Sequence, residues 1–233
     1  PTADGAATID VADSTFTDAA GNNNTAADQF NWTYDGTRPT MTITATAGSN
    51  AVSDGSTTND GTLTVTFTSS EATTNFAVGD ITITNGSLSS LSDTSTTVYT
   101  ATFTPTADGA ATIDVGAAGF TDAYGNNNTA ATQFNWTYDG TRPTMTITAS
   151  EGSDPFTSND ATLSLIFTSS EATDDFVKAD DITVTNGTLG SLSDTSTTVY
   201  TATFTPEADG AATSDVADSA FTDAYGNNNT AAA

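Results

Sequence analysis

Short stretches of alternating polar and apolar residues run along the whole chain. The segment 62–68 places leucine, valine and phenylalanine at every second position, with threonine between them. The same alternation recurs at 40–44 and 81–84. A two-residue period with threonine outward is typical of half-buried antiparallel strands, and no stretch shows an apolar helical period of helical length. The pattern therefore predicts an all-β protein.

Turn sequences such as Asn-Gly and Gly-Asn-Asn-Asn separate these stretches. Within 36–139 we expect seven strands, near 38–45, 61–69, 80–85, 87–92, 97–105, 110–116 and 130–138. Seven short alternating strands in about 100 residues are typical of an immunoglobulin-like antiparallel β-sandwich. The alternation predicts a core that contains Met41, Ile43, Leu63, Val65, Phe67, Ile81, Ile83, Phe103, Ile113, Phe134 and Trp136.

The sequence also repeats itself at a period of about 100 residues. PTADGAATIDV at 1–11 returns at 105–115, and returns again as PEADGAATSDV at 206–216, so the offsets are 104 and 101 residues. Residues 1–45 and 105–149 agree at 39 of 45 positions. This period is too long for a solenoid unit and suits an independent domain. The chain is therefore predicted to be a tandem array of immunoglobulin-like sandwiches.

The repeats predict three segments. Residues 36–139, here called the first repeat, form a complete domain, and residues 140–233, the second repeat, lack the last strand. Residues 1–35 supply only the last two strands of a preceding domain, so we expect the chain to be a piece of a longer protein. In the second repeat Ser214 stands where the first has Ile113, which predicts a buried hydroxyl without a partner and a weaker strand.

Composition narrows the classes of function. Three cationic residues face 29 acidic ones, which gives a net charge of −26. This charge argues against binding nucleic acid or anionic lipid, and it favours bound cations or high salt. No apolar run reaches 18 residues, so no membrane insertion is expected. Without histidine or cysteine the chain lacks the commonest general base and any thiol chemistry, and we expect no enzyme.

Several segments together resemble a known family. RPTMTITA, TLTVTFTSSEAT, GDITITNG, VYTATFTPTADGAATIDV and FTDAYGNNNTA, in that order, are similar to the bacterial immunoglobulin-like repeats of giant surface adhesins. The resemblance covers essentially the whole chain. It implies an extracellular or cell-surface location, long tandem arrays, calcium at the domain junctions and an adhesive tip of unknown ligand. The linker Asp35-Gly36-Thr37-Arg38-Pro39 departs from the family's Asp-Thr-Thr-Ala-Pro, and Gly36 predicts a looser junction.

Candidate metal ligands gather where the topology brings loops together. In an immunoglobulin-like sandwich the B–C, D–E and F–G loops share the pole that the linker enters. Acids and amides at this pole of the first repeat are Asp35, Glu71, Asn75, Asp93, Asp122 and Asn126. Their counterparts in the second are Asp139, Glu171, Asp174, Asp175, Asp194, Asp223 and Asn227, whereas Asp54, Asp60 and Asp108 lie at the opposite pole of the first repeat.

Calcium prefers six to eight hard oxygen ligands. The sequence therefore predicts Ca²⁺ sites formed by Asp35, Glu71 and Asp122 and by Asp139, Glu171 and Asp223. The alternative for each single acid is the ordinary turn role, in which the side chain accepts hydrogen bonds from nearby backbone groups.

Three functions remain open from the sequence. The first is a structural spacer or stalk of an adhesin-like surface protein, with neighbouring repeats as its partners and calcium at the junctions. The second is the building unit of a self-assembling extracellular filament or surface layer, in which one copy of the chain donates a strand to another. The third is a module that binds glycan or ice through an exposed aromatic or flat threonine face, and paired carboxylates leave glycoside hydrolysis as a remote alternative.

Overall fold

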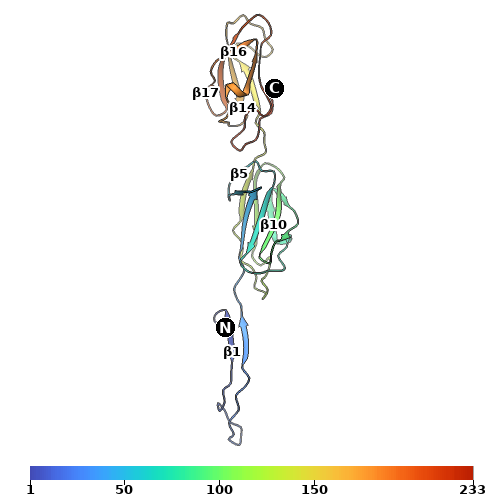
Figure 1. Ribbon diagram of the computed structural model, residues 1–233, viewed down its shortest axis with the longest axis vertical. Coiled ribbons are helices and arrows are strands. Elements are labelled where there is room, and N and C mark those ends of the chain that lie inside the picture. Colours follow the sequence, from blue (N-terminus) through green and yellow to red (C-terminus); the bar gives the residue numbers. More distant parts are fainter. Residues whose placement is uncertain (233) are drawn as a thin grey trace. The chain divides into compact units, whose positions relative to one another are not determined.

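The structure is a computed structural model that describes residues 1–232, with the side chains of 178 and 179 left aside. The chain has two compact units (Figure 1). Unit one comprises residues 1–53, 63–103 and 112–134, and unit two comprises 54–62, 104–111 and the chain from 135 onward. The last residue of the predicted segment 140–233 lies outside the described residues.

Unit one contains a large antiparallel sheet. Its strands are β3 (Met41–Ala47), β4 (Asn50–Val52), β6 (Leu63–Ser69), β8 (Gly86–Leu88) and β10 (Val98–Pro105), in the order β4-β3-β6-β10-β8, and β9 (Ser92–Asp93) also pairs with β10. The register sets Ile43 opposite Phe67 and Phe67 opposite Tyr99. A separate two-stranded sheet joins β1 (Gly5–Ile9) and β2 (Phe30–Tyr34).

A second sheet has the order β5-β12-β11-β7, formed by β5 (Thr57–Thr58), β7 (Ile81–Thr84), β11 (Gly109–Val115) and β12 (Phe134–Tyr138). With the strands lettered A to G, the first repeat thus pairs A-B-E-D in one sheet and C-F-G in the other. This is the arrangement of an immunoglobulin-like sandwich. The predicted fold class is confirmed.

The core of the first repeat follows the alternation of its strands. Leu63, Val65 and Phe67 are fully buried, as is Phe103 on β10. Phe76 packs its ring against Phe67, Tyr99 and Phe120, with ring centroids 5.2–5.6 Å apart. All but two of the predicted core residues are buried, and the exceptions, Ile81 and Ile83, are half-buried on β7. β7 is the edge of its sheet, which explains the partial exposure.

Unit two repeats the large sheet with β13 (Met145–Ala149), β14 (Leu163–Ser169), β16 (Gly187–Leu189) and β18 (Val199–Pro206) in the order β13-β14-β18-β16. The strand β17 (Ser193–Asp194) pairs with β18, as β9 does with β10. A two-stranded sheet joins β15 (Ile182–Thr185) and β19 (Thr213–Val216). Phe176 contacts Tyr200 and Phe221 at the centre of this core.

Some local elements lie outside the seven-strand prediction. β4 and β5 are short strands between the predicted A and B strands. Single helical turns, η1 (Val78–Asp80) and α1 (Lys178–Asp181), precede β7 and β15. In each turn an aspartate carboxylate accepts the backbone N–H three or four residues earlier, Asp80 from Ala77 at 2.8 Å and Asp181 from Val177 at 2.5 Å. No helix among the described residues is long and apolar enough to cross a membrane.

Candidate metal centre

Three acids from distant parts of unit one meet at one place. Asp35 comes from the linker before β3, Glu71 from the loop after β6, and Asp122 from the loop between β11 and β12. One carboxylate oxygen of each lies within 4.8 Å of those of the other two. Asp35 and Glu71 are half-buried and Asp122 is buried. The structure therefore brings together the three acids that the sequence selected, as side chains of one cluster.

The loop geometry fixes Asp122. Its Oδ1 accepts the backbone N–H groups of Tyr124 at 2.8 Å and Asn126 at 2.9 Å, and its Oδ2 accepts the Asn126 side-chain amide at 2.8 Å. Burial opposes ionisation, but these donors outweigh it and hold the pKa of Asp122 below its usual value. Asp122 is therefore a carboxylate at neutral pH and faces the cluster as an anion.

The same amide ties the linker to this loop. Asn126 Nδ2 also donates to the backbone carbonyl of Asp35 at 3.2 Å. The Asp35 carboxylate in turn accepts the backbone N–H of Thr37 at 3.0 Å. Asn126 thus sets the position of Asp35 relative to Asp122, which is why two acids more than 80 residues apart in sequence share one cluster.

Glu71 experiences the opposite electrostatic balance. Partial burial raises its pKa, and the nearby charges of Asp35 and Asp122 raise it further. An acid whose pKa is raised by folding destabilises the folded state above that pKa, because its charged form is disfavoured there. A bound cation would reverse this effect by favouring the charged form.

The cluster meets the geometric requirement of a calcium site. Oxygens that bind one Ca²⁺ at about 2.3–2.6 Å lie at most about 5 Å apart, and the three carboxylates satisfy this limit. Carboxylates are hard ligands of the kind that Ca²⁺ prefers. The three carboxylates would supply part of the six to eight oxygen ligands of such a site, and water or other oxygens would supply the rest.

Unit two forms the same cluster from Asp139, Glu171 and Asp223, with carboxylate oxygens again within 4.8 Å of one another. Asn227 donates to Asp223 at 2.8 Å and to the carbonyl of Asp139 at 3.0 Å. Burial together with Asp139 and Asp223 raises the pKa of Glu171, whereas hydrogen bonds from Asn227 overcome burial and lower that of Asp223. The geometry is thus reproduced in the second repeat, where the residues that flank the three acids are nearly identical to those of the first.

Each linker is also clamped by an aspartate that precedes it by about 30 residues. Asp108 Oδ1 accepts the backbone N–H of Gly140 at 2.8 Å, and its Oδ2 accepts the Thr141 hydroxyl. These donors lower the pKa of Asp108. A Cβ on Gly140 would lie 2.3 Å from the Tyr138 hydroxyl oxygen. Glycine therefore permits close packing of the linker. Gly36 has similar surroundings, since a Cβ there would lie 2.7 Å from the Tyr34 hydroxyl oxygen, and the looser junction expected from Gly36 stays a prediction.

In the first linker Asp4 accepts the Gly36 N–H at 2.8 Å and the Thr37 hydroxyl, so the clamp is repeated. The clamping aspartates stand in the two copies of the Ala-Asp-Gly sequence that precede a linker. The sequence analysis placed Asp108 at the opposite pole without a role. Its position at a fixed spacing before the linker in both copies was the available signal.

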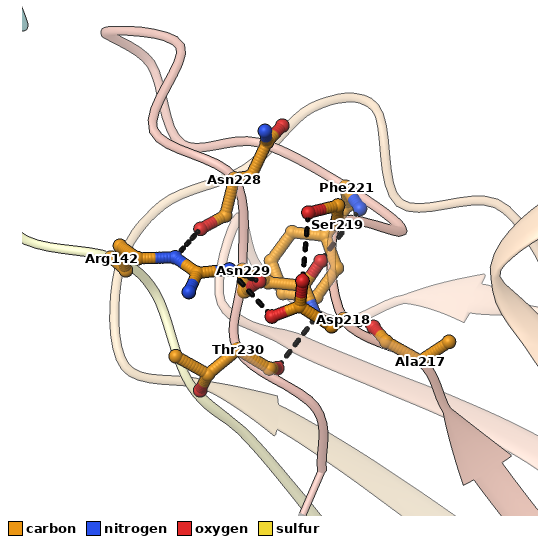
Figure 2. A network of polar contacts seen from close by, with 8 residues as sticks. All are labelled: Arg142, Ala217, Asp218, Ser219, Phe221, Asn228, Asn229 and Thr230. Carbon is orange, nitrogen blue, oxygen red and sulfur yellow. Dashed lines mark hydrogen bonds and ion pairs between the residues drawn. The ribbon is translucent and has the colours of Figure 1, made fainter.

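Arginine anchors the other side of the linker. Arg142 Nε donates to the carbonyl of Asn228 at 2.8 Å, and its terminal nitrogen donates to the carbonyl of Asn229 at 2.5 Å and to Asp218 Oδ1 at 2.6 Å (Figure 2). The ion pair is exposed, at 45% and 59% of the two side chains, so it stabilises little. The hydrogen bonds to the loop carbonyls are the main interaction.

A fully buried asparagine stabilises the loop to which Arg142 donates its hydrogen bonds. Asn229 Oδ1 accepts the backbone N–H of Phe221 at 2.9 Å, and its amide donates to the carbonyls of Ala217 at 2.8 Å and Thr230 at 2.7 Å (Figure 2). The side chain is fully buried and its polar atoms all have partners. The asparagines of the Gly-Asn-Asn-Asn run thus make different contacts, and the residue type alone did not reveal these differences.

The first repeat uses the same anchor without the ion pair. Arg38 donates to the carbonyls of Asn127 and Asn128, both at 2.8 Å, and Asn128 is fully buried. Ala117 stands where the second repeat has Asp218. The two arginines of the chain therefore serve the two linkers in the same way, a role that the sequence analysis missed.

Other acids and amides of the predicted pole lie outside the cluster. Asn75 joins its loop to the next by accepting the Thr121 N–H at 3.1 Å and donating to the Thr121 hydroxyl at 3.2 Å. Asp175 accepts the equivalent groups of Thr222. Asp93 and Asp194 are exposed strand residues. The cluster thus contains only some of the acids and amides that the sequence placed at the pole.

The structure consists of tandem immunoglobulin-like sandwiches, and the aspartate at the start of each linker belongs to one acidic cluster. The family model of the bacterial Ig-like domain matches residues 35–138 and again 139–233. The chain therefore belongs to the bacterial Ig-like domain family, as the sequence resemblance indicated. No curated protein matches the chain significantly.

Three solved structures are similar. Invasin, a bacterial integrin-binding protein, matches at 18% identity and a TM-score of 0.45, over 92% of this chain and 42% of its own. FdeC, an adhesin of Escherichia coli, matches at 16% and 0.41, over 90% and 68%. InvD of Yersinia pseudotuberculosis matches at 20% and 0.32, over 85% and 58%. The chain spans less than half the length of invasin.

Proposed function

We propose that the chain is a structural spacer of an adhesin-like bacterial surface protein, stiffened where successive repeats join by a divalent cation such as Ca²⁺. Membership of the bacterial Ig-like family supports the structural role. The inference of a bound cation rests on the duplicated cluster, in which the carboxylate oxygens of a linker acid and two loop acids lie within 4.8 Å of one another in both repeats. The role requires no catalytic residue.

The linker contacts give this proposal a mechanism. Asp108 holds Gly140 and Thr141, while Arg142 holds the loop that positions Asp223. A cation shared by Asp139, Glu171 and Asp223 would fasten the same linker at a third point, because Asp139 belongs to it. Each added contact removes conformational freedom from a linker of about five residues.

Small-angle scattering tests this role. Addition of Ca²⁺ to the chain in constant ionic strength should narrow the distribution of interrepeat distances, and a chelator should broaden it again. The paired variant Glu71→Gln and Glu171→Gln, which keeps side-chain volume, should show a much smaller response. Scattering curves that are identical with and without Ca²⁺ would contradict a stiffening role.

A further inference from the structure

The chain of the first repeat changes its partner strand between β4 and β5. β4 pairs with β3 in the large sheet, whereas β5, a few residues later, pairs with β12 in the second sheet. Gly55 lies between the two short strands at a φ of 78°, in the left-handed region that favours glycine. The change of partner places a segment from the early part of the repeat beside the strand that ends it.

A continuous run of backbone hydrogen bonds joins residues 54–58 to residues 135–139. The N–H of Gly55 donates to the carbonyl of Asn135 at 2.7 Å, that of Thr137 to Ser56 at 2.9 Å, and that of Asp139 to Thr58 at 3.0 Å. The donors alternate between the two segments, as they do in a parallel pair. The register accordingly places Thr57 opposite Thr137.

Side chains at both ends of the segment add to this run. Asp54 Oδ1 accepts the backbone N–H of Asn135 at 2.6 Å and its side-chain amide at 3.2 Å. Thr58 Oγ1 accepts the indole N–H of Trp136 at 3.1 Å. Trp136 is only 3% exposed, so water has little access with which to compete for this bond. The segment is therefore attached to β12 along its whole length.

The parallel direction of β5 and β12 decides how tension along the chain would reach them. The linker 35–39 leads through β3 and β4 to the N-terminal end of β5, and the linker 139–143 leaves from the C-terminal end of β12. Tension therefore pulls the two strands from opposite ends, so that all the bonds between them share the load. Strands pulled from the same end lose their bonds one at a time. β3 pairs with β4 and β6, so its release from them would leave the β5–β12 pair intact.

We propose that the β5–β12 pair carries tension along the chain and sets the resistance of the first repeat to forced unfolding. The proposal rests on the spacer function, in which each repeat lies in series between two attached ends. Forced unfolding is governed by the rate of crossing the unfolding barrier. A contact loaded in shear raises that barrier, because its hydrogen bonds must break together.

Single-molecule force measurement on the whole chain tests the direction of loading. The chain has no cysteine, so Thr40→Cys with Thr144→Cys, both at exposed positions, supplies two attachment points that load the first repeat from its two ends. Thr62→Cys in place of Thr40→Cys loads β5 and β12 from the same end, because residue 62 follows β5 and residue 144 follows β12. At equal force, the first attachment should give unfolding that is slower by about tenfold or more.

A matched pair of variants tests the contact itself. Thr58→Val removes the hydroxyl that accepts the Trp136 N–H and should raise the unfolding rate under opposite-end load about tenfold, as expected for the loss of one buried hydrogen bond. Thr84→Val is the control. It removes a hydroxyl that accepts the backbone N–H of Thr112 at 3.0 Å in the β7–β11 pair, and should change this rate by less than about twofold. Chemical denaturation of both variants separates lost stability from lost force resistance.

Two results would each overturn the proposal: equal unfolding rates for the two attachments, or a Thr58→Val variant that unfolds under load no faster than Thr84→Val. The comparison of attachments leaves the β5–β12 pair unaltered, so it decides the question even if Thr58→Val fails to fold. Because the load is applied directly to the molecule, either failure would leave the spacer function standing. A stiffening role refuted by scattering would, in turn, leave these rates unchanged.

Discussion

Replacing Ser214 with isoleucine should stabilise the second repeat. Ser214 pairs with Val184 across β15 and β19, in the register that places Ile113 opposite Ile83 in the first repeat. Ile113 is 2% exposed, whereas the Ser214 hydroxyl is buried without a partner. The predicted placement of this serine is therefore confirmed, and its effect on stability is the quantity to measure.

Two terms add in the substitution. An unpartnered buried hydroxyl costs about 1–3 kcal/mol, and that cost disappears. A fully buried isoleucine contributes about 1.5–3 kcal/mol, of which we count about half because Ser214 is half-buried. An open groove of about 500 Å³, which Ser214 lines, leaves room for the larger side chain. Ser214→Ile should therefore add about 2 kcal/mol or more, which raises Tm by about 8–16 °C in a domain of this size.

Differential scanning calorimetry is the suitable assay. Both tryptophans precede residue 140, so their fluorescence does not report directly on the second repeat. Ser193→Ile, at an exposed strand position, is the control and should change stability by less than about 0.5 kcal/mol. An unchanged or lowered Tm for Ser214→Ile alone would refute the reasoning, because it would show that the hydroxyl is solvated and the strand register mistaken.

Three further changes test other parts of the structure. Phe67→Ala, at a fully buried position, should cost about 3–5 kcal/mol in chemical denaturation. Glu171→Gln should raise Tm at pH 7 without divalent ions, because folding raises the pKa of this acid; the gain should disappear below about pH 4, where the unfolded carboxyl is also protonated. Arg142→Met should cost about 1–2 kcal/mol through its carbonyl hydrogen bonds, whereas Asp218→Asn should cost less than about 1 kcal/mol because that ion pair is exposed.

Each of these has a result that would contradict it. An unchanged denaturation midpoint for Phe67→Ala would show that Phe67 does not stabilise the core. A substantial helical signal in the circular dichroism of the wild-type chain would contradict the β-sandwich fold. A Glu171→Gln variant that is less stable at pH 7 would mean that the cluster is stabilising without a cation. If Arg142→Met and Asp218→Asn lowered the free energy of unfolding equally, the ion pair and not the carbonyl hydrogen bonds would account for the stabilisation by Arg142.

Alternation of side chains was enough to predict the seven main strands of the first repeat. Leucine, valine and phenylalanine at every second position fix which face of β6 is buried, and the structure buries all three. β4 and β5 were not predicted, because strands of two or three residues are too short to show a period. β5 pairs in parallel with β12, a contact set by tertiary structure.

The acidic cluster was predictable because loop positions in this fold are fixed by topology. Asp35, Glu71 and Asp122 therefore met as expected. The supports around them depend on side-chain geometry that residue type does not reveal. Asn126 and Asn128 have the same chemistry, but one bridges to the linker and the other is buried within its loop. Metal binding by the cluster stays a prediction.

Calorimetric titration with Ca²⁺ in a large excess of sodium tests the central claim most directly. The account predicts two bound ions per chain, one for each cluster, and one ion in each of the single variants Glu71→Gln and Glu171→Gln. Asp93→Asn, which changes an exposed acid outside the clusters, should retain two. Calcium heats that are absent, or that are the same in the wild-type chain and both glutamate variants, would contradict the account.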